Sequence, residues 1–188
     1  MIYVVSGMGR SGTSMMMNAL IMGGVPGAYE PDKAIDRLAK LKANGYDANP
    51  NGVFELYKPD VVRLFPDGLD GYAVKIADFM WERLQGLASQ GINVVYILRN
   101  REDVCSSMKA FNPLCNKEAV GKRRDSQLDI IRCVMSRPDV VNVTVISYED
   151  VIADPLRSFE ILKEAGFPIN VVKAASVVNP NYQHFKEK

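Results

Sequence analysis

A length of 188 residues suits one folded domain with a single core. Apolar residues at 47% and charged residues at 24% are the proportions of a globular protein, and a formal net charge of +1 argues against nucleic acid or a membrane as a partner. Three cysteines without a Cys-x-x-Cys pair indicate neither a disulfide framework nor a zinc site, and the lack of a signal peptide or of ~18 consecutive apolar residues leads us to expect a cytoplasmic protein.

The beginning of the chain predicts a strand, a glycine-rich turn and a helix. The β-branched run Ile2–Val5 is typical of a buried parallel strand. Gly7–Gly12 supplies the turn, and the apolar stretch Met15–Met22 predicts a helix that ends at Gly23-Gly24. Backbone N–H groups and the positive end of a helix converge in such an arrangement. The sequence therefore predicts a site for a phosphate-like anion at this turn.

The spacing Gly7-x-x-x-x-Gly12-Thr13-Ser14 nearly satisfies the nucleotide-binding P-loop pattern. Thr13 stands where that pattern has lysine, and the cation comes earlier, at Arg10. The segment GRSGTS closely resembles the 5′-phosphosulfate loop of the sulfotransferases, which take a sulfuryl group from 3′-phosphoadenosine 5′-phosphosulfate (PAPS). A glycine turn without function is the alternative. The residues that the resemblance assigns to donor binding are Gly9, Arg10, Ser11, Gly12, Thr13 and Ser14.

The next part of the chain gives weaker signals. Gly24–Ala28 has the composition of a short strand, and Asp32–Ala43 that of an amphipathic helix. The segment Asn49–Glu55 (NPNGVFE) then resembles the Asn-Pro-x-Gly-aromatic-aromatic-Glu segment of bacterial sulfotransferase-like proteins, with Val53 at the first aromatic position. We expect Glu55 to lie near the donor loop and to take the proton of an acceptor hydroxyl; a solvated glutamate is the other interpretation.

A further buried strand is predicted over Tyr72–Ile76, with Lys75 near its end. Cytosolic sulfotransferases carry a Lys-x-His group at the end of a comparable strand, where the lysine assists the departing phosphate and the histidine acts as the base. Lys75 matches that lysine, whereas Ala77 takes the place of the histidine. The base must then come from elsewhere, with Glu55 as the first candidate and Asp78 as the second. An ordinary surface charge is the alternative for Lys75.

The run Ile92–Leu98 is the clearest strand of the chain, and its apolar character predicts a central position. Arg99 follows it directly, and Ser107 comes eight residues later, within RNREDVCSS. This segment resembles the Arg-Asn-x-x-Asp-Val-x-x-Ser pattern with which sulfotransferases bind the 3′-phosphate, so the resemblance implies that role for Arg99 and Ser107. The planar guanidinium of arginine suits phosphate oxygens at the carboxyl end of a sheet. Helix capping by Asn100 and Asp103 explains part of the motif structurally.

The last third of the chain predicts helices around one more strand. A helix is expected over Lys117–Met135, and its basic cluster Lys122-Arg123-Arg124 is either a solvated face or a surface toward the nucleotide or an anionic acceptor. Val141–Ile146 predicts the last strand. Tyr148 follows in a Tyr-Glu-Asp segment that resembles the one in the same family, which implies a position near the adenine; packing at the strand end is the alternative. Two more helices are expected over Leu156–Ala165 and Val171–Val178.

These motifs together predict an α/β fold with three layers, α/β/α, around a central parallel sheet of the P-loop nucleotide-binding type, in one domain over residues 1–188. The resemblance implies a PAPS-dependent sulfotransferase that modifies a hydroxyl, or less readily an amine, of a small-molecule or carbohydrate acceptor. The product of the donor is 3′,5′-adenosine bisphosphate. Its catalytic residues are expected to be Glu55, Lys75 and Arg10, without a metal ion.

Two other functions stay open at this point. A P-loop kinase of a small molecule shares the loop, but the P-loop lysine is absent and the central strand ends in arginine. A sulfotransferase-like domain that binds nucleotide without turnover is supported by the missing histidine. The chain is also shorter than most members of the family, so we expect an acceptor pocket that is reduced or is completed by another subunit of a homo-oligomer.

Overall fold

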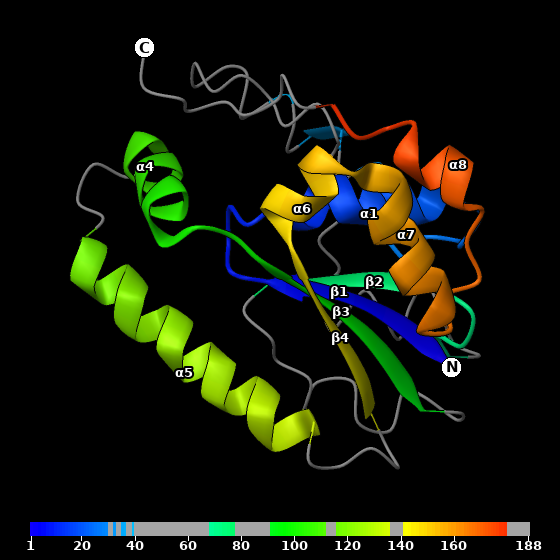
Figure 1. Cartoon of the computed structure of the whole chain (residues 1–188), viewed down its shortest axis with the longest axis horizontal. Coiled ribbons are helices and arrows are strands. Elements are labelled where there is room, and N and C mark those ends of the chain that lie inside the picture. The colour runs from blue at the N-terminus through cyan, green and yellow to red at the C-terminus, as the bar shows by residue number, and fades with distance from the viewer. Residues whose placement is uncertain are drawn as a thin grey trace.

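The structure is a computed structural model, and it describes residues 1–29, 68–77, 91–111, 116–135 and 141–179, with the helical positions 32, 35, 36 and 39. In this part of the chain, strands form one parallel sheet in the order β2-β1-β3-β4 (Figure 1). The strands are β1 (Ile2–Gly7), β2 (Ala73–Ala77), β3 (Ile92–Leu98) and β4 (Val141–Ser147). The helices are α1 (Thr13–Met22), α4 (Arg101–Phe111), α5 (Lys117–Met135), α6 (Tyr148–Ala153), α7 (Pro155–Glu164) and α8 (Val171–Ala175).

The carboxyl ends of the strands lie along one edge of the sheet. Gly7, the last residue of β1, pairs with Ala77 of β2 and with Ile97 of β3, and Leu98 of β3 pairs with Ser147 of β4. Because β1 and β3 are neighbours, the segments that follow them start side by side. This edge is the usual ligand-binding edge of an open parallel sheet.

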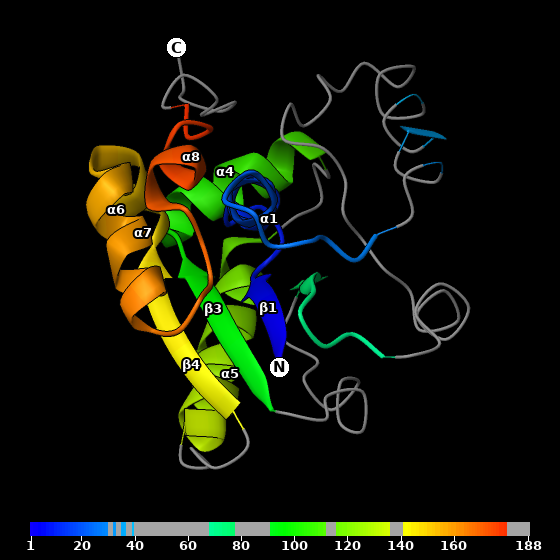
Figure 2. The same cartoon turned by 90° about the vertical axis from the view of Figure 1, so that its right-hand side faces the viewer.

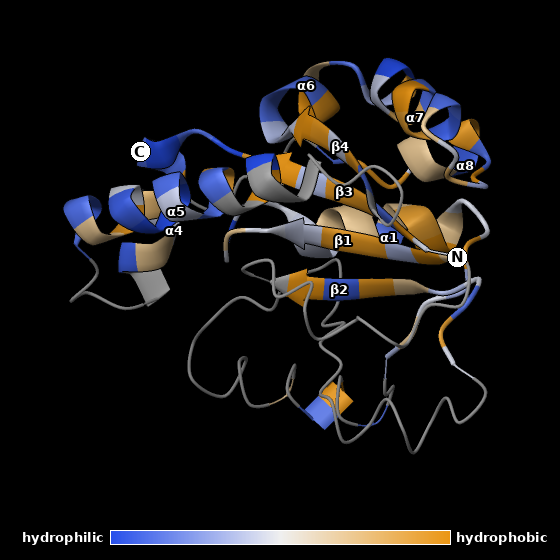
Figure 3. Ribbon diagram, turned by 90° about the horizontal axis from the view of Figure 1, so that it is seen from below, coloured by the Kyte–Doolittle hydropathy of each residue, from blue (hydrophilic) through white to orange (hydrophobic). Residues whose placement is uncertain are grey.

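Helices cover both faces of the sheet, which confirms the predicted three-layer α/β/α fold. Helices α1, α6, α7 and α8 lie on one face and α5 lies on the other (Figures 1 and 2). Successive strand residues point to opposite faces, so Val5 and Val95 pack toward α1 and α7, whereas Val4 and Val94 pack on the side of α5. Figure 3 shows the strands as largely hydrophobic and the hydrophilic stretches on the outer helices.

Individual side chains hold the helices against the sheet. Phe159 of α7 is completely buried in the core on the α1 side, a position where burial of a phenylalanine contributes about 2–3 kcal/mol. On the other face, the Tyr96 hydroxyl of β3 donates to Gln127 Oε1 of α5 at 2.5 Å. Among the helices that the structure describes, none combines the length and the apolar character that a bilayer crossing demands.

Comparison with the expected elements shows where the sequence pattern was sufficient. The bounds of β3 and α5 match the predicted Ile92–Leu98 and Lys117–Met135. The strand predicted over Gly24–Ala28 is wrong, because only a single parallel bridge forms there, between Gly27 and Ala73. Pro26 lacks the N–H group that a continuing ladder would require. Helix α8 also ends three residues earlier than predicted, at Ala175.

Candidate functional site

The loop between β1 and α1 depends on backbone conformations that glycine adopts most readily. Gly7 and Gly12 have φ of 151° and 100°, and Arg10 also lies in the left-handed region, with φ of 72°. A Cβ on Gly7 would lie 2.5 Å from Ser11 Oγ, and one on Gly12 would lie 2.5 Å from Cδ2 of Tyr148. The loop therefore requires glycine at both positions, which are two of the three glycines in the motif.

The start of α1 presents hydrogen-bond donors and no acidic side chain. Gly12 occupies the N-cap position and offers no side chain to the first N–H groups of the helix. Ser11 is 1% exposed and Thr13 is also buried, and Ser11 Oγ has no hydrogen-bond partner among the described residues. Gly9 is less constrained, since the one contact of a Cβ there with a described residue would be with the Met108 methyl group at 3.6 Å. The N–H groups of the first helical turn, which have no partner within the helix, suit an anion together with the hydroxyls and the positive end of the helix.

Lys75 of β2 reaches the first turn of α1. Its side chain is only 6% exposed, and its Nζ donates to Ser14 Oγ at 3.1 Å. Lysine is rarely this buried unless it has a partner, so the interpretation of Lys75 as an ordinary surface charge is wrong. The hydrogen bond places a cation beside the loop, next to one of the hydroxyls predicted to bind the donor.

The segment after β3 touches the loop after β1. Arg99 Nη1 donates to the carbonyl oxygen of Arg10 at 3.0 Å, and Arg10 Nε donates to Ser107 Oγ of α4 at 2.9 Å. Ser107 is buried, and Arg99 Nε is buried without a hydrogen-bond partner in the described part of the chain. The two predicted anion-binding segments are therefore adjacent and directly bonded to each other.

Burial and repulsion act together on Arg10. Burial lowers the pKa of Arg10, and the neighbouring charge of Arg99 lowers it further. Arginine stays protonated in proteins despite such a shift, so two positive guanidinium groups are held close together. An anion placed beside them would relieve this repulsion.

Tyr148, the first residue of α6, packs between the two segments. Tyr148 is 6% exposed, Gly12 lies against its Cδ2–Cε2 edge, and the Arg99 guanidinium carbon lies 4.4 Å from the ring centroid. Burial raises the pKa of Tyr148, Arg99 opposes this, and the charges of Glu149 and Asp103 add to the rise. The ring therefore supports Arg99 by a cation–π contact, and its low exposure leaves little ring surface for stacking with an adenine. The contact with adenine stays a prediction.

Glu149 of α6, a residue that the sequence analysis missed, contacts the start of α4. Asn100 caps this helix as expected, because its Oδ1 accepts the N–H of Glu102 at 2.8 Å. Glu149 Oε1 accepts the N–H of Asn100 at 2.9 Å, although Glu149 follows a different strand. The available signal was its place in the Tyr-Glu-Asp segment directly after β4.

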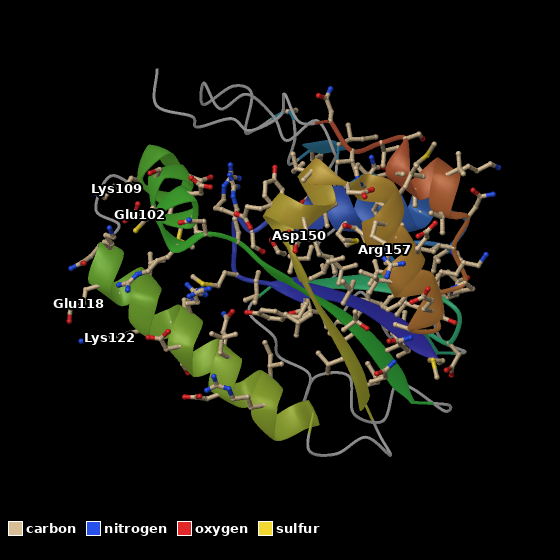
Figure 4. The ribbon with its side chains drawn as sticks, in the orientation of Figure 1. Glu102, Lys109, Glu118, Lys122, Asp150 and Arg157 are labelled. Atoms are coloured by element: carbon tan, nitrogen blue, oxygen red, sulfur yellow. The ribbon has the colours of Figure 1, made fainter. Side chains whose placement is uncertain are left out.

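The remaining candidate residues fall into two groups, those outside the described residues and those that the structure places elsewhere. Glu55 and Asp78, the two candidate bases, lie outside the described residues. Lys122 is 77% exposed and pairs with Glu118 at 2.8 Å on the side of α5 that faces away from the sheet (Figure 4). For Lys122 the solvated face is thus the correct interpretation. Among the described residues, no group of three or more His, Cys, Asp and Glu side chains is placed to hold a metal ion.

Comparison with known proteins gives likenesses in structure. Neither protein-family models nor the sequences of characterised proteins match this chain significantly. The sulfotransferase domain of the olefin synthase from Synechococcus PCC 7002 matches with a TM-score of 0.54 and 14% identity over 98% of this chain and 82% of that domain. The sulfotransferase domain from the curacin biosynthetic pathway matches with a TM-score of 0.53 and 16% identity over 98% of this chain and 85% of that domain.

Retinol dehydratase, crystallised with androsterone and the inactive cofactor PAP, gives a TM-score of 0.48 at 14% identity. This chain spans 64% of the length of that protein. The matches to the two sulfotransferase domains each extend over 98% of this chain. The chain therefore has the fold of the sulfotransferase domains, a parallel α/β fold with a P-loop after its first strand.

Proposed function

We propose that this chain is a sulfotransferase that uses PAPS as the donor. The observation that carries the proposal is the hydrogen bond between the two predicted anion-binding segments, in which Arg10 Nε donates to Ser107 Oγ at 2.9 Å. PAPS has one anionic group at its 5′ end and another at its 3′ position. A protein that binds both groups needs two cationic sites at neighbouring strand ends. The segments after β1 and β3 have this arrangement, and we call them the 5′ corner, at Arg10, and the 3′ corner, at Arg99 and Ser107.

Unsatisfied polar atoms at this edge fit such a ligand. Ser11 Oγ and Arg99 Nε are both buried and without a hydrogen-bond partner among the described residues. A buried polar group without a partner costs about 1–3 kcal/mol, so the protein gains if a ligand supplies the acceptor. Gly7 and Gly12 leave no space for a side chain in the loop, which keeps the backbone N–H groups accessible to a phosphate.

The chain's own residues take the following parts in the proposal. The loop N–H groups, Arg10, Thr13 and Ser14 hold the phosphosulfate end and stabilise the charge that builds up on it. Arg99 and Ser107 hold the 3′-phosphate. Lys75 assists departure of the 5′-phosphate, and these cations together do the work that magnesium does in kinases.

The proposed reaction balances as a simple group transfer. The donor supplies the sulfuryl group: the bond from its sulfur to the 5′-phosphate oxygen breaks, and a bond from the sulfur to the oxygen or nitrogen of the acceptor forms. The acceptor is a hydroxyl, or an amine, of a small molecule or carbohydrate, and its proton passes to a base, for which Glu55 is the proposed residue. The other product is 3′,5′-adenosine bisphosphate.

Calorimetry with 3′,5′-adenosine bisphosphate tests the donor assignment. We expect this nucleotide to bind at least tenfold more tightly than AMP, and more tightly than ATP with magnesium, because only it engages both corners. Binding of the bisphosphate no tighter than that of AMP would refute the 3′-phosphate site. Tighter binding of magnesium-ATP would favour a kinase instead.

A nucleotide-binding domain without turnover is the second candidate, and Ala77 favours it. β2 carries Lys75 but ends in alanine at the position where the resemblance leads one to expect histidine. Incubation with PAPS labelled in the sulfuryl group and a panel of hydroxyl and amine acceptors separates the two functions. Labelled product that depends on Lys75 supports the transferase, and binding of the bisphosphate without any transfer supports the second candidate.

A further inference from the structure

The end of β4 holds the beginning of α4 through the carboxylate of Glu149. Glu149 Oε1 accepts the backbone N–H of Asn100 at 2.9 Å, and Glu149 Oε2 accepts the hydroxyl of Ser147 at 2.9 Å. Ser147 is the last residue of β4, and its Oγ also accepts the N–H of Asp150 at 3.2 Å as the cap of α6. One carboxylate thus joins the carboxyl ends of two neighbouring strands.

Asn100 holds the backbone between Arg99 and α4, the two parts of the proposed 3′ corner. It follows Arg99 directly, its Oδ1 accepts the N–H of Glu102, and its carbonyl accepts the N–H of Val104 at 3.1 Å, so it fixes the first turn of α4. Ser107 lies further along the same helix. The direction of Arg99 and the position of Ser107 therefore both depend on how the backbone at Asn100 is held.

Two consecutive residues of α6, which follows β4, contact Arg99 and Asn100. The Tyr148 ring lies under the Arg99 guanidinium at 4.4 Å, and Glu149 binds the next backbone N–H. We propose that Glu149 is a positioning residue of the donor site: it fixes Asn100, and through Asn100 it sets Arg99 and Ser107 for the 3′-phosphate. This inference rests on the proposed function, which assigns that phosphate to those two residues.

The charge of Glu149 makes the inference testable. A carboxylate near a phosphate repels it, so removal of Glu149 would strengthen nucleotide binding if charge alone mattered. A positioning role has the opposite sign, because loss of the hydrogen bond frees Asn100 and misplaces Arg99. The sign of the change in affinity therefore separates the two effects.

The experiment compares Glu149→Ala, Glu149→Gln and the wild-type chain by calorimetry with 3′,5′-adenosine bisphosphate and with AMP. Glu149→Ala should weaken bisphosphate binding about tenfold and AMP binding by a clearly smaller factor, because only the bisphosphate uses Arg99 and Ser107 directly, whereas AMP is affected only through the bond from Arg99 to the Arg10 carbonyl. Glu149→Gln should recover most of the affinity, since its amide oxygen still accepts the Asn100 N–H. The matched control is Glu160→Ala, an exposed glutamate on α7, which should change neither affinity.

Two outcomes overturn the inference: Glu149→Ala binds the bisphosphate as tightly as the wild type or more tightly, or it loses affinity for AMP to the same degree. If the wild type itself fails to prefer the bisphosphate, the proposed function fails, and amide hydrogen exchange then decides on Glu149 alone. Protection of the Asn100 N–H should fall at least tenfold in Glu149→Ala and not in Glu149→Gln. Unchanged protection there would show that Glu149 does not position the corner.

Discussion

Arg99 and Arg10 are joined by a hydrogen bond although they lie 89 positions apart in the sequence: Arg99 Nη1 donates to the carbonyl oxygen of Arg10 at 3.0 Å. The bond uses the backbone of Arg10 in its left-handed conformation, with φ of 72°. Such a conformation is strained for a residue with a side chain and persists only where the surroundings hold it. Arg99 thus supports the shape of the opening loop as well as carrying charge at the corner after β3.

Replacement of Arg99 should affect both corners. Arg99→Ala removes a fork-shaped donor and the support of the Arg10 carbonyl, and we expect affinity for 3′,5′-adenosine bisphosphate to fall about 30- to 100-fold in calorimetry. Arg99→Lys should recover only a small part of the lost affinity. An ammonium group has neither the paired N–H donors of a guanidinium nor its planar face, which lies on Tyr148.

An exposed arginine provides the control for this change. Within the described part of the chain, Arg157 of α7 pairs with two surface glutamates, Glu160 and Glu164, and Arg157→Ala should leave the affinity unchanged. Equal losses in Arg99→Ala and Arg157→Ala would indicate a general effect of net charge. Full recovery in Arg99→Lys would show that the corner needs a charge alone and not the planar group.

Two glycines with similar backbones separate conformational strain from steric conflict. Gly12 and Gly24 have φ of 100° and 106°, but a Cβ on Gly12 would meet Tyr148 at 2.5 Å, whereas no atom of the described residues lies within 4 Å of one on Gly24. Gly24→Ala should cost about 1 kcal/mol of unfolding free energy, from strain alone. Gly12→Ala should cost at least about 2 kcal/mol and abolish bisphosphate binding, because the ring must move. Thermal unfolding measures the stability of both variants, and calorimetry measures their bisphosphate binding. Equal losses of stability in the two variants would contradict the packing of Tyr148 on Gly12.

The sequence predicted the elements whose patterns are local. β3 is a continuous run of apolar residues, and α5 has apolar side chains at helical spacing, so both were found with their correct bounds. Gly24–Ala28 looked like a strand by composition, but the effect of Pro26 depends on the hydrogen bonds that the neighbouring strand β2 offers. A proline at an edge is compatible with a strand in one register and not in another.

Properties of the site that depend on distant contacts were beyond the sequence. The burial of Lys75 follows from its place beneath the first turn of α1, and that of Tyr148 from Gly12 and Arg99, which belong to two other segments. The motif residues identified the edge of the sheet where these groups meet. Their separate spacings carried no information on the hydrogen bond from Arg10 to Ser107, because that geometry is tertiary.

The hydroxyl and the ring of Tyr148 should have different roles. Tyr148→Phe keeps the ring under Arg99, so we expect bisphosphate affinity within about twofold of the wild type. Tyr148→Ala should lose about 3 kcal/mol of stability, since it empties the space between Gly12 and Arg99. Calorimetry and thermal unfolding of both variants test this. A tenfold loss of affinity in Tyr148→Phe with unchanged stability would instead support a hydroxyl contact with the adenine.

Tyr148 also predicts how stability changes at alkaline pH. Burial raises its pKa in the folded chain above the ordinary value of about 10, so the unfolded chain releases this proton first. The contribution of the protonated Tyr148 hydroxyl to the free energy of unfolding is therefore complete below a pH of about 10. It is lost as the pH rises toward the higher pKa of the folded state. Urea unfolding at several alkaline pH values should show this loss in the wild type and a smaller one in Tyr148→Phe. The same slope in both proteins would mean that Tyr148 is not the group responsible.

Lys75 offers the clearest test of catalysis as distinct from binding. Lys75→Met keeps most of the buried volume and removes the charge that is bonded to Ser14. If Lys75 stabilises the departing phosphate, single-turnover transfer from labelled PAPS should slow about 100-fold or more, because charge that develops only in the transition state loses its partner. Bisphosphate affinity should fall much less than the rate. Lys173→Met, an exposed lysine on α8, is the control and should change neither quantity. A loss of affinity as large as the loss of rate would assign Lys75 to ground-state binding, and an unchanged rate would remove it from the proposed mechanism.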